Sequence, residues 1–165
     1  MFRHKNHVTT LKRNMKESKH HRRVKKFSEL SLDELYKIIQ LRIDVFVVEQ
    51  DCPYSDLDDK DQNATHLYYE TEEGDVIGYI RILDKGVSYK EIAIGRVIIK
   101  ESYRKYKLGH QLMQDGIDYI ESMGETEIRI SAQEHLRKFY ERLGFEKVGE
   151  MYLEDDIPHI QMFKI

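Results

Sequence analysis

The sequence predicts an α/β domain in which helices lie against a mixed β-sheet. Three observations indicate this class: apolar residues at helical spacing in several segments, Ile- and Val-rich runs of strand length between them, and turn residues at the junctions. The chain has 165 residues, of which 40% are hydrophobic and 35% charged, as is typical of one globular domain with a single core. Its apolar runs fall short of the roughly 18 residues that a membrane span needs, so we expect no such span.

The first element is a helix that begins at residues 31–34. The Ser31 hydroxyl and the Glu34 carboxylate form a capping box, in which each satisfies an otherwise unpaired backbone amide. Cys52-Pro53 ends this region and opens an acidic loop. The expected apolar face of the helix consists of Leu32, Leu35, Tyr36, Ile39, Ile43 and Phe46.

Strands and helices alternate through the rest of the chain. Residues 66–71 and 75–83 flank a Glu-Gly turn as the two arms of a hairpin, and residues 91–99 are rich enough in Ile and Val for a buried strand. This alternation predicts a mixed sheet covered by helices. The remaining elements are a helix on Leu108, Leu112, Ile117 and Ile120 that ends at Gly124, a strand at 127–132, a short helix at 136–143 that ends at Gly144, and strands at 145–153 and 159–163.

The charge is distributed unevenly. Residues 1–26 contain ten lysines and arginines and one glutamate, whereas the whole chain has a net charge of −3. We expect residues 1–21 to be a basic extension and residues 22–165 a single domain. Val8, Leu11 and Met15 at helical spacing suit an amphipathic helix on nucleic acid, a ribosome or another anionic surface, or a transit peptide. The alternative is a disordered tail, with Met15 as the true start.

The chain has one cysteine, Cys52. A single cysteine excludes an internal disulfide and any cluster of thiolate metal ligands. We therefore expect a reducing, cytoplasmic location and no metal cofactor.

Residues 95–113 lead from a strand through a basic turn directly into a helix. The unpaired amides and the positive dipole end of such a helix lie beside Arg104, Lys105 and Lys107, a combination that suits a polyphosphate. The alternative is an ordinary strand–helix loop with solvated cations.

Together with Ser131-Ala132-Gln133 and residues 139–145 (FYERLGF), this segment resembles the GCN5-related N-acetyltransferases. Further phrases, such as VFVVEQ at 45–50 and IPHI at 157–160, resemble the ElaA-like branch of that superfamily. The resemblance covers residues 22–165 and implies a GNAT-type fold: a central, twisted, mixed and mostly antiparallel sheet flanked by helices. It implies acetyl-CoA as co-substrate and a primary amine, on a small molecule or a protein, as acceptor. Monomer and homodimer remain open.

The resemblance also implies a coenzyme site. The strand before the basic turn splays from its neighbour in this family, which frees its backbone for the pantetheine arm. Lys107 stands where the family motif has glycine, so its side chain is expected to shift the loop. The implied coenzyme-binding residues are Val97, Ile98, Ile99, Arg104, Lys105, Lys107, Leu108, Gly109, His110 and Gln133.

Acetyl transfer needs an oxyanion donor, a general acid and a deprotonated amine. The resemblance gives the first role to a backbone amide near Val97 and the second to Tyr140, although Tyr140 also fits a buried core position. Glu49 and His66 are implied near the acceptor as candidate bases, with His159 and a water relay as alternatives.

The acceptor side is expected to be acidic. Tyr54, Asp58 and the neighbouring aspartates suit a cationic amine, and His159 is a further substrate-binding candidate; the alternative is a solvated loop. The leading hypothesis is an acetyl-CoA-dependent N-acetyltransferase. The alternative is a CoA-binding module without turnover, whose basic arm binds RNA, a ribosome or an anionic surface.

Overall fold

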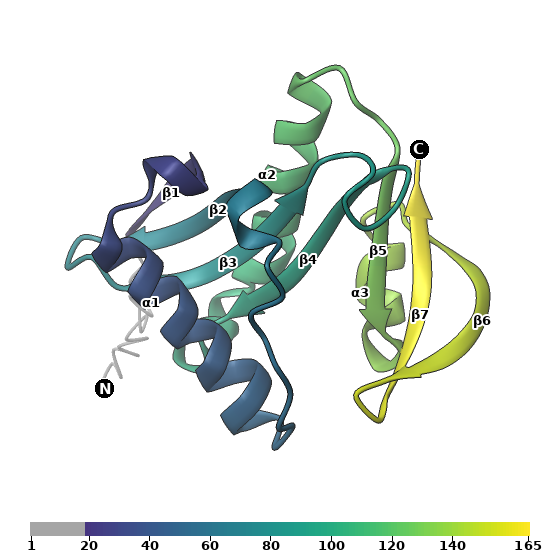
Figure 1. Cartoon of the computed structure of the whole chain (residues 1–165), viewed down its shortest axis with the longest axis horizontal. Helices are drawn as coiled ribbons and strands as arrows, with labels where there is room; N and C mark the ends of the chain where they lie inside the picture. Colours follow the sequence, from purple (N-terminus) through teal and green to yellow (C-terminus); the bar gives the residue numbers. More distant parts are fainter. Residues whose placement is uncertain (1–18) are drawn as a thin grey trace, which may run out of the picture.

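A seven-stranded sheet in the order β1-β2-β3-β4-β5-β7-β6 forms the centre of the protein (Figure 1). The structure is a computed structural model and describes residues 19–165. Neighbouring strands are antiparallel except β4 and β5, which are parallel, so the expected mixed and mostly antiparallel sheet is confirmed. The strands are β1 (His20–Lys26), β2 (Ala64–Thr71), β3 (Val76–Leu83), β4 (Ile92–Ile99), β5 (Ile128–Gln133), β6 (Glu146–Glu154) and β7 (Ile157–Lys164).

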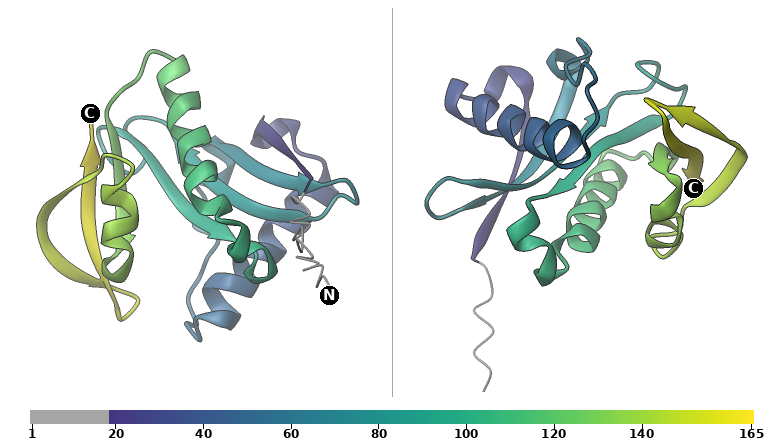
Figure 2. Two further views of the ribbon diagram at one scale, coloured as in Figure 1. Left: turned by 180° about the vertical axis from the view of Figure 1, so that it is seen from behind. Right: turned by 90° about the horizontal axis from the view of Figure 1, so that it is seen from below.

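Helices cover both faces of the sheet (Figure 2). On one face lies α1 (Leu32–Arg42), which continues as the π-helical segment η2 (Ile43–Glu49). On the other face lie α2 (Leu108–Ser122) and α3 (Arg137–Glu141). Each face has its own apolar cluster, because both sides of the central strands are buried. Among residues 19–165, no helix combines the length and the apolar character that crossing a membrane requires.

The start of α1 is as predicted. The Ser31 hydroxyl accepts a hydrogen bond from the Glu34 amide at 3.1 Å, and the Glu34 carboxylate accepts one from the Ser31 amide at 2.8 Å. The predicted apolar face is only partly buried: Phe46 packs against the core, whereas Leu32 and Tyr36 are 87% and 69% exposed. The residues that α1 and η2 bury are Ile38, Leu41, Arg42 and Val45. A pattern of apolar residues assigns Arg42 to solvent, whereas in the fold carboxylates hold it inside.

The later elements follow the predicted order. The hairpin of β2 and β3 turns at Gly74, and Gly124 and Gly144 follow α2 and α3; all three glycines have φ between +82° and +87°. Glycine is the residue that adopts this left-handed conformation without a Cβ clash. The sequence therefore specified these boundaries to within a few residues.

The strand β1 is an element that the sequence did not predict. It begins at His20, two residues before the expected domain boundary, and pairs with β2 along its length. Three of its basic side chains contact acidic groups of the domain: Arg22 with Asp115, Arg23 with Glu70, and Lys25 with Glu34. Part of the basic segment is thus a charged edge strand. The predicted helix at residues 8–15 and the proposed role of the arm lie outside the described residues.

The parallel pair β4–β5 is short. The strands pair only at Ile92 with Ile128 and at Ala93 with Arg129, and then diverge (Figure 1). On its other edge β4 pairs with β3 up to Ile99, so its far half keeps one hydrogen-bonded neighbour. The opening between β4 and β5 positions the candidate site.

A β-bulge distorts β4 inside this opening. On β3, Tyr79 pairs with Ile98 and Arg81 with Gly95, which leaves two residues of β4, Arg96 and Val97, opposite a single residue of β3. Arg96 has φ +54°, a left-handed conformation that costs a non-glycine residue roughly 1–2 kcal/mol. Such a strained position is often part of a functional site.

Candidate active site

A cleft of about 640 Å³ lies where β4 and β5 diverge. One wall is β4 from Ala93 to Ile99, together with the end of η2 and the acidic loop that follows it. The other wall is formed by β5, the start of α3 and the turn between β6 and β7. The cleft therefore has two chemically different ends, one near the start of α2 and one near the acidic loop.

The start of α2 has the features of an anion site. The N-cap residue Lys107 makes no side-chain capping bond, and the first turn contains no acidic residue. Lys107 has φ +58°, a left-handed conformation that glycine adopts more easily than lysine. The lysine side chain therefore adds a strain of roughly 1 kcal/mol at this position. The first amides of α2 are left for a ligand.

The predicted coenzyme residues fall into two groups. Val97, Ile98, Ile99, Arg104 and Gln133 line the cleft. Lys105 and residues 107–110 do not line it, but form the loop and the first turn of α2 beside the end of β4. A Cβ on Gly109 would lie 3.8 Å from both Ile99 and Phe139, so this turn is held between β4 and α3.

Arg104 and Glu49 form an ion pair at the edge of the cleft. The two guanidinium nitrogens lie 2.5 and 2.8 Å from the carboxylate oxygens, and Arg104 Nε donates to the carbonyl of Ile99 at 3.0 Å. The hydrogen bond from Arg104 lowers the pKa of Glu49. A carboxylate held in this way is a poor proton acceptor, so the structure favours Glu49 as a partner of Arg104 over the expected role as base.

The next residue, Gln50, was missed in the sequence. Its side-chain oxygen accepts a hydrogen bond from Gln133 Nε2 at 3.2 Å. Glu49 and Gln50 at the end of η2 thus contact one predicted coenzyme residue on each wall. A π-helical turn often occurs at a functional site, but no spacing of apolar residues reveals it.

Tyr140 extends from α3 into the cleft. Its ring packs edge-on against Phe139 and Phe145, and the residue is only 6% exposed. Its hydroxyl makes no hydrogen bond to any residue in 19–165. Burial raises the pKa of Tyr140, so the phenol keeps its proton at neutral pH. Tyr140 is therefore packed in the core and also lines the cleft.

His66 does not reach the cleft. It is fully buried, with Nδ1 2.8 Å from the Tyr79 hydroxyl and Nε2 3.0 Å from the Asp61 carbonyl. Burial lowers the pKa of His66 and favours the neutral ring. The expectation that His66 is a base near the acceptor is corrected: both ring nitrogens are engaged by the protein, away from solvent.

His159 lies on β7 and lines the cleft. Its Nδ1 is 2.8 Å from the carbonyl of Ile157, which makes Nδ1 the donor and leaves the lone pair on Nε2 in the neutral ring. The ring stacks on Tyr152, and His159 pairs with Gln133 of β5 in the sheet. Of the two histidines considered, His159 is the one with a free nitrogen at the cleft.

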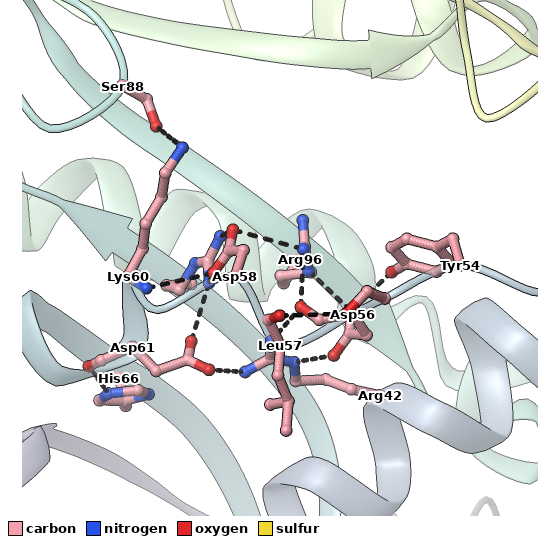
Figure 3. A network of polar contacts seen from close by, with 12 residues as sticks. Arg42, Tyr54, Asp56, Leu57, Asp58, Lys60, Asp61, His66, Ser88 and Arg96 are labelled. Carbon is pink, nitrogen blue, oxygen red and sulfur yellow. Dashed lines mark hydrogen bonds and ion pairs between the residues drawn. The ribbon is translucent and has the colours of Figure 1, made fainter.

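The acidic loop is neutralised by arginines (Figure 3). We call this group the arginine–aspartate cluster: Arg42, Arg81, Arg96, Asp56, Asp58 and Asp61. Asp56 bonds to Arg42 at 2.7 Å and to Arg96 at 2.8 Å, and Tyr54 donates to the same carboxylate at 2.5 Å.

Asp61 and Asp58 complete the cluster. Asp61 bridges Arg42 and Arg81 at 2.9 and 2.8 Å, and Asp58 forms a two-point pair with Arg81 at 2.7 Å for each contact. Three acidic residues thus meet three basic ones. Arginines thus pair with the aspartates of the loop in which Tyr54 and Asp58 were expected to bind a cationic acceptor, so the loop offers less negative charge than its sequence indicates.

The sequence matches known proteins over most of its length. The family model of the acetyltransferase (GNAT) domain matches residues 31–165. Protein ElaA of Escherichia coli is 42% identical over 139 residues, covering 82% of this chain and 90% of ElaA. A UPF0039 protein of Schizosaccharomyces pombe is 36% identical, covering 84% of this chain and 92% of that protein.

The chain belongs to the GNAT acetyltransferase family. Solved structures agree: an acyl-CoA N-acyltransferase from Pseudomonas aeruginosa has a TM-score of 0.84 and 41% identity, and E. coli ElaA has 0.82 and 37%. Each comparison covers 89% of this chain and all of the other. The expected ElaA-like resemblance is confirmed, and with this family comes an acyl-CoA co-substrate.

Within this GNAT domain, the arginines of the cluster were the residues most easily missed. Arg81 lies between Ile80 and Ile82, and Arg96 between Gly95 and Val97. A lone arginine within an apolar strand is a signal for a buried ion pair, because an unpaired charge there is too costly. The sequence contained that signal, but it does not identify the partners.

The cluster makes stability depend on acid pH. Burial alone would raise the pKa of Asp58, but the hydrogen bonds from Arg81 lower it to about 2. An unfolded aspartate titrates near pH 4, so below about pH 5 the unfolded chain binds more protons than the folded one. We expect the free energy of unfolding, measured by urea denaturation, to fall steadily from pH 5 toward pH 2.

Asp58→Asn removes one of these groups, so the variant should lose less stability over this range than the wild type does. Asp33→Asn is the control, because the Asp33 side chain is 77% exposed and its substitution should leave the slope unchanged. Equal slopes in all three proteins would contradict the prediction.

Proposed function

We propose that the protein transfers the acetyl group of acetyl-CoA to the nitrogen of a primary amine, on a small molecule or a protein. The observation that carries this proposal is the cleft between β4 and β5, which meets the uncapped start of α2 at one end. Bound acetyl-CoA would supply the acetyl group as a reactive thioester. The far half of β4 has no strand partner on its cleft side, so its backbone is available to an extended pantetheine arm.

The start of α2 and Arg104 support binding of the diphosphate. Free amides at a helix N-terminus and the positive end of its dipole favour an anion. Arg104 adds a planar guanidinium that suits phosphate oxygens. In the free protein the Glu49 carboxylate forms an ion pair with the Arg104 guanidinium. The diphosphate of the coenzyme therefore competes with Glu49 for Arg104.

Three groups at the cleft support the chemistry. We assign the Tyr140 hydroxyl, which is protonated and makes no hydrogen bond to the described residues, as the donor of a proton to the leaving thiolate. We propose that Nε2 of His159 is the base that accepts a proton from the acceptor amine. The bulge at Arg96 and Val97 turns the β4 backbone, and the Val97 amide is the proposed donor to the developing oxyanion.

The test is turnover by the full-length chain with acetyl-CoA and a panel of primary amines. We expect release of free CoA, and a higher melting temperature when acetyl-CoA is present. In Tyr140→Phe, kcat should fall about 100-fold while the Kd for acetyl-CoA stays within about twofold, since the hydroxyl acts on the leaving group.

Phe139→Leu is the matched control, because it alters the same apolar contact without removing a hydroxyl. If the wild type binds acetyl-CoA but no amine releases CoA, the enzyme proposal is wrong. If Tyr140→Phe turns over as fast as the wild type, Tyr140 is a core residue only.

Arg104 and Glu49 should affect coenzyme binding in opposite directions. Arg104→Ala removes a phosphate ligand and should weaken binding about tenfold. Glu49→Gln releases Arg104 from its ion pair; an exposed pair is worth up to about 1 kcal/mol, so binding should tighten by up to about fivefold. Titration calorimetry with CoA measures both, and weaker binding by Glu49→Gln would show that Glu49 positions Arg104 rather than competing for it.

His159→Gln tests the assignment of the base. Glutamine retains a polar group of similar size but cannot accept the proton, so kcat should fall roughly 100-fold. His135→Gln is the control, since His135 also lines the cleft but has no assigned role in the proton transfer. A kcat of His159→Gln equal to that of the wild type would favour a water relay.

A further inference from the structure

We propose that the acceptor amine also carries a carboxylate, and that Arg96 binds this carboxylate at the end of the cleft away from α2. The proposal rests on the proposed acetyl transfer and narrows its acceptor to an amino-carboxylate such as a free amino acid. Its basis is the balance of hydrogen-bond donors and acceptors in the arginine–aspartate cluster. That balance leaves donors without acceptors at the cleft.

Every carboxylate oxygen in the cluster already accepts a hydrogen bond. In Asp56, Oδ2 accepts from Arg42 and Oδ1 from both Arg96 and Tyr54. Both oxygens of Asp58 accept from Arg81, and the two of Asp61 accept from Arg42 and Arg81. The aspartates of the cluster are therefore already paired with arginines, whose positive charge opposes the binding of an ammonium group there.

The arginines, in contrast, keep unused donors. Arg96 uses Nε and Nη2 on Asp56, whereas its Nη1 has no partner within residues 19–165. Arg81 is 3% exposed, and its Nε is the buried side-chain nitrogen without a partner in the same range. Both arginines line the cleft. A guanidinium with free N–H groups at a polar cavity calls for an anionic acceptor.

Lys60 adds a second cation to the same wall. Its Nζ donates to the Ser88 hydroxyl at 2.9 Å and makes no ion pair with the described residues. Lys60 and Ser88 both line the cleft (Figure 3). The three arginines of the cluster are balanced by its three aspartates, and Lys60 adds a further cation that lines the cleft.

The opposite wall has the complementary charge. Glu154, near the turn from β6 to β7, accepts a hydrogen bond from Ser131 at 2.8 Å and makes no ion pair with the described residues. It lines the cleft together with His159. An ammonium group attracted by Glu154 would meet the proposed base, while a carboxylate on the same molecule would face Arg96. The separation of charges thus fits a zwitterion with its amine toward β7.

This arrangement distinguishes amino-carboxylates from the other acceptors. A polyamine has a second cation where the cleft offers Arg96 and Lys60, so charge repulsion would weaken its binding. The amine of a protein N-terminus has a neutral amide in place of the carboxylate and would leave Arg96 Nη1 without an anionic acceptor. We therefore expect free amino acids to be preferred over both.

The experiment compares pairs of acceptors that differ only in the carboxylate. The full-length chain is assayed for CoA release with amino acids and their amides, with lysine and cadaverine, and with β-alanine and phosphoethanolamine. For the best amino acid we expect kcat/KM to exceed that of its amide by roughly 10- to 100-fold, as for the loss of a charged hydrogen bond. Equal rates, or a preference for cadaverine or phosphoethanolamine, would overturn the proposal.

Substitution of Arg96 gives the second readout. Arg96→Gln should raise KM for the amino acid 10- to 100-fold while leaving that for the amide within about twofold. Arg96→Lys, which keeps the charge, should recover part of the loss. Lys90→Gln is the control, because the Lys90 side chain is 87% exposed. Calorimetry with CoA checks that Arg96→Gln still folds, and a proportional loss for acid and amide would overturn the role of Arg96.

The experiments distinguish a failure of the proposed acetyl transfer from a failure of the proposed carboxylate site. If no amine releases CoA, the proposed function fails, and the acceptor site is then tested by binding. With CoA present, millimolar amino acids should raise the melting temperature more than their amides do. Equal shifts for acid and amide would overturn the carboxylate site. Turnover without discrimination would overturn the carboxylate site and leave acetyl transfer intact.

Discussion

The partial pairing of β4 is the constraint on which the rest of the structure depends. A central strand normally satisfies its backbone groups on both edges, but β4 has a partner on the β5 side only at Ile92 and Ala93. The cleft exists because the two strands separate there. Their separation also places α2, which follows β4, and α3, which follows β5, at the two sides of the end that we propose for the coenzyme. The unfilled backbone of β4 is thus the reason for a site at this position.

The arginine–aspartate cluster stabilises the other end of the cleft. It links α1, the acidic loop, β3 and β4 through charges that are buried at Arg42, Asp56, Asp61 and Arg81 and partly exposed at Asp58 and Arg96. Removal of such charges from water is costly, and their mutual attraction repays this only when nearly all hydrogen bonds are made. Every carboxylate oxygen of the cluster accepts a hydrogen bond, whereas Arg81 Nε and Arg96 Nη1 have no acceptor among residues 19–165. The two arginines that carry the remaining donors, Arg81 and Arg96, both line the cleft.

Much of the fold was predictable from the sequence, since strand runs, capping residues and glycines act locally. The exposed Leu32 and buried Arg42 show where this reading fails: partners 14 and 19 residues away decide which face of α1 is buried. The same holds for the site. Motifs located Arg104, Gln133 and Tyr140, but not the ion pair of Arg104 with Glu49. The spacing of residues along the sequence does not show which charged side chains pair when they lie far apart in the chain.

Arg96 connects the two ends of the cleft. Its backbone forms part of the bulge in β4, and its side chain bonds to the carboxylate and the carbonyl of Asp56. Those two contacts offset the strain of its left-handed conformation. Glycine would adopt this backbone more easily but would lose both contacts and the cation. The presence of arginine at a position suited to glycine is therefore explained when its guanidinium also serves the acceptor.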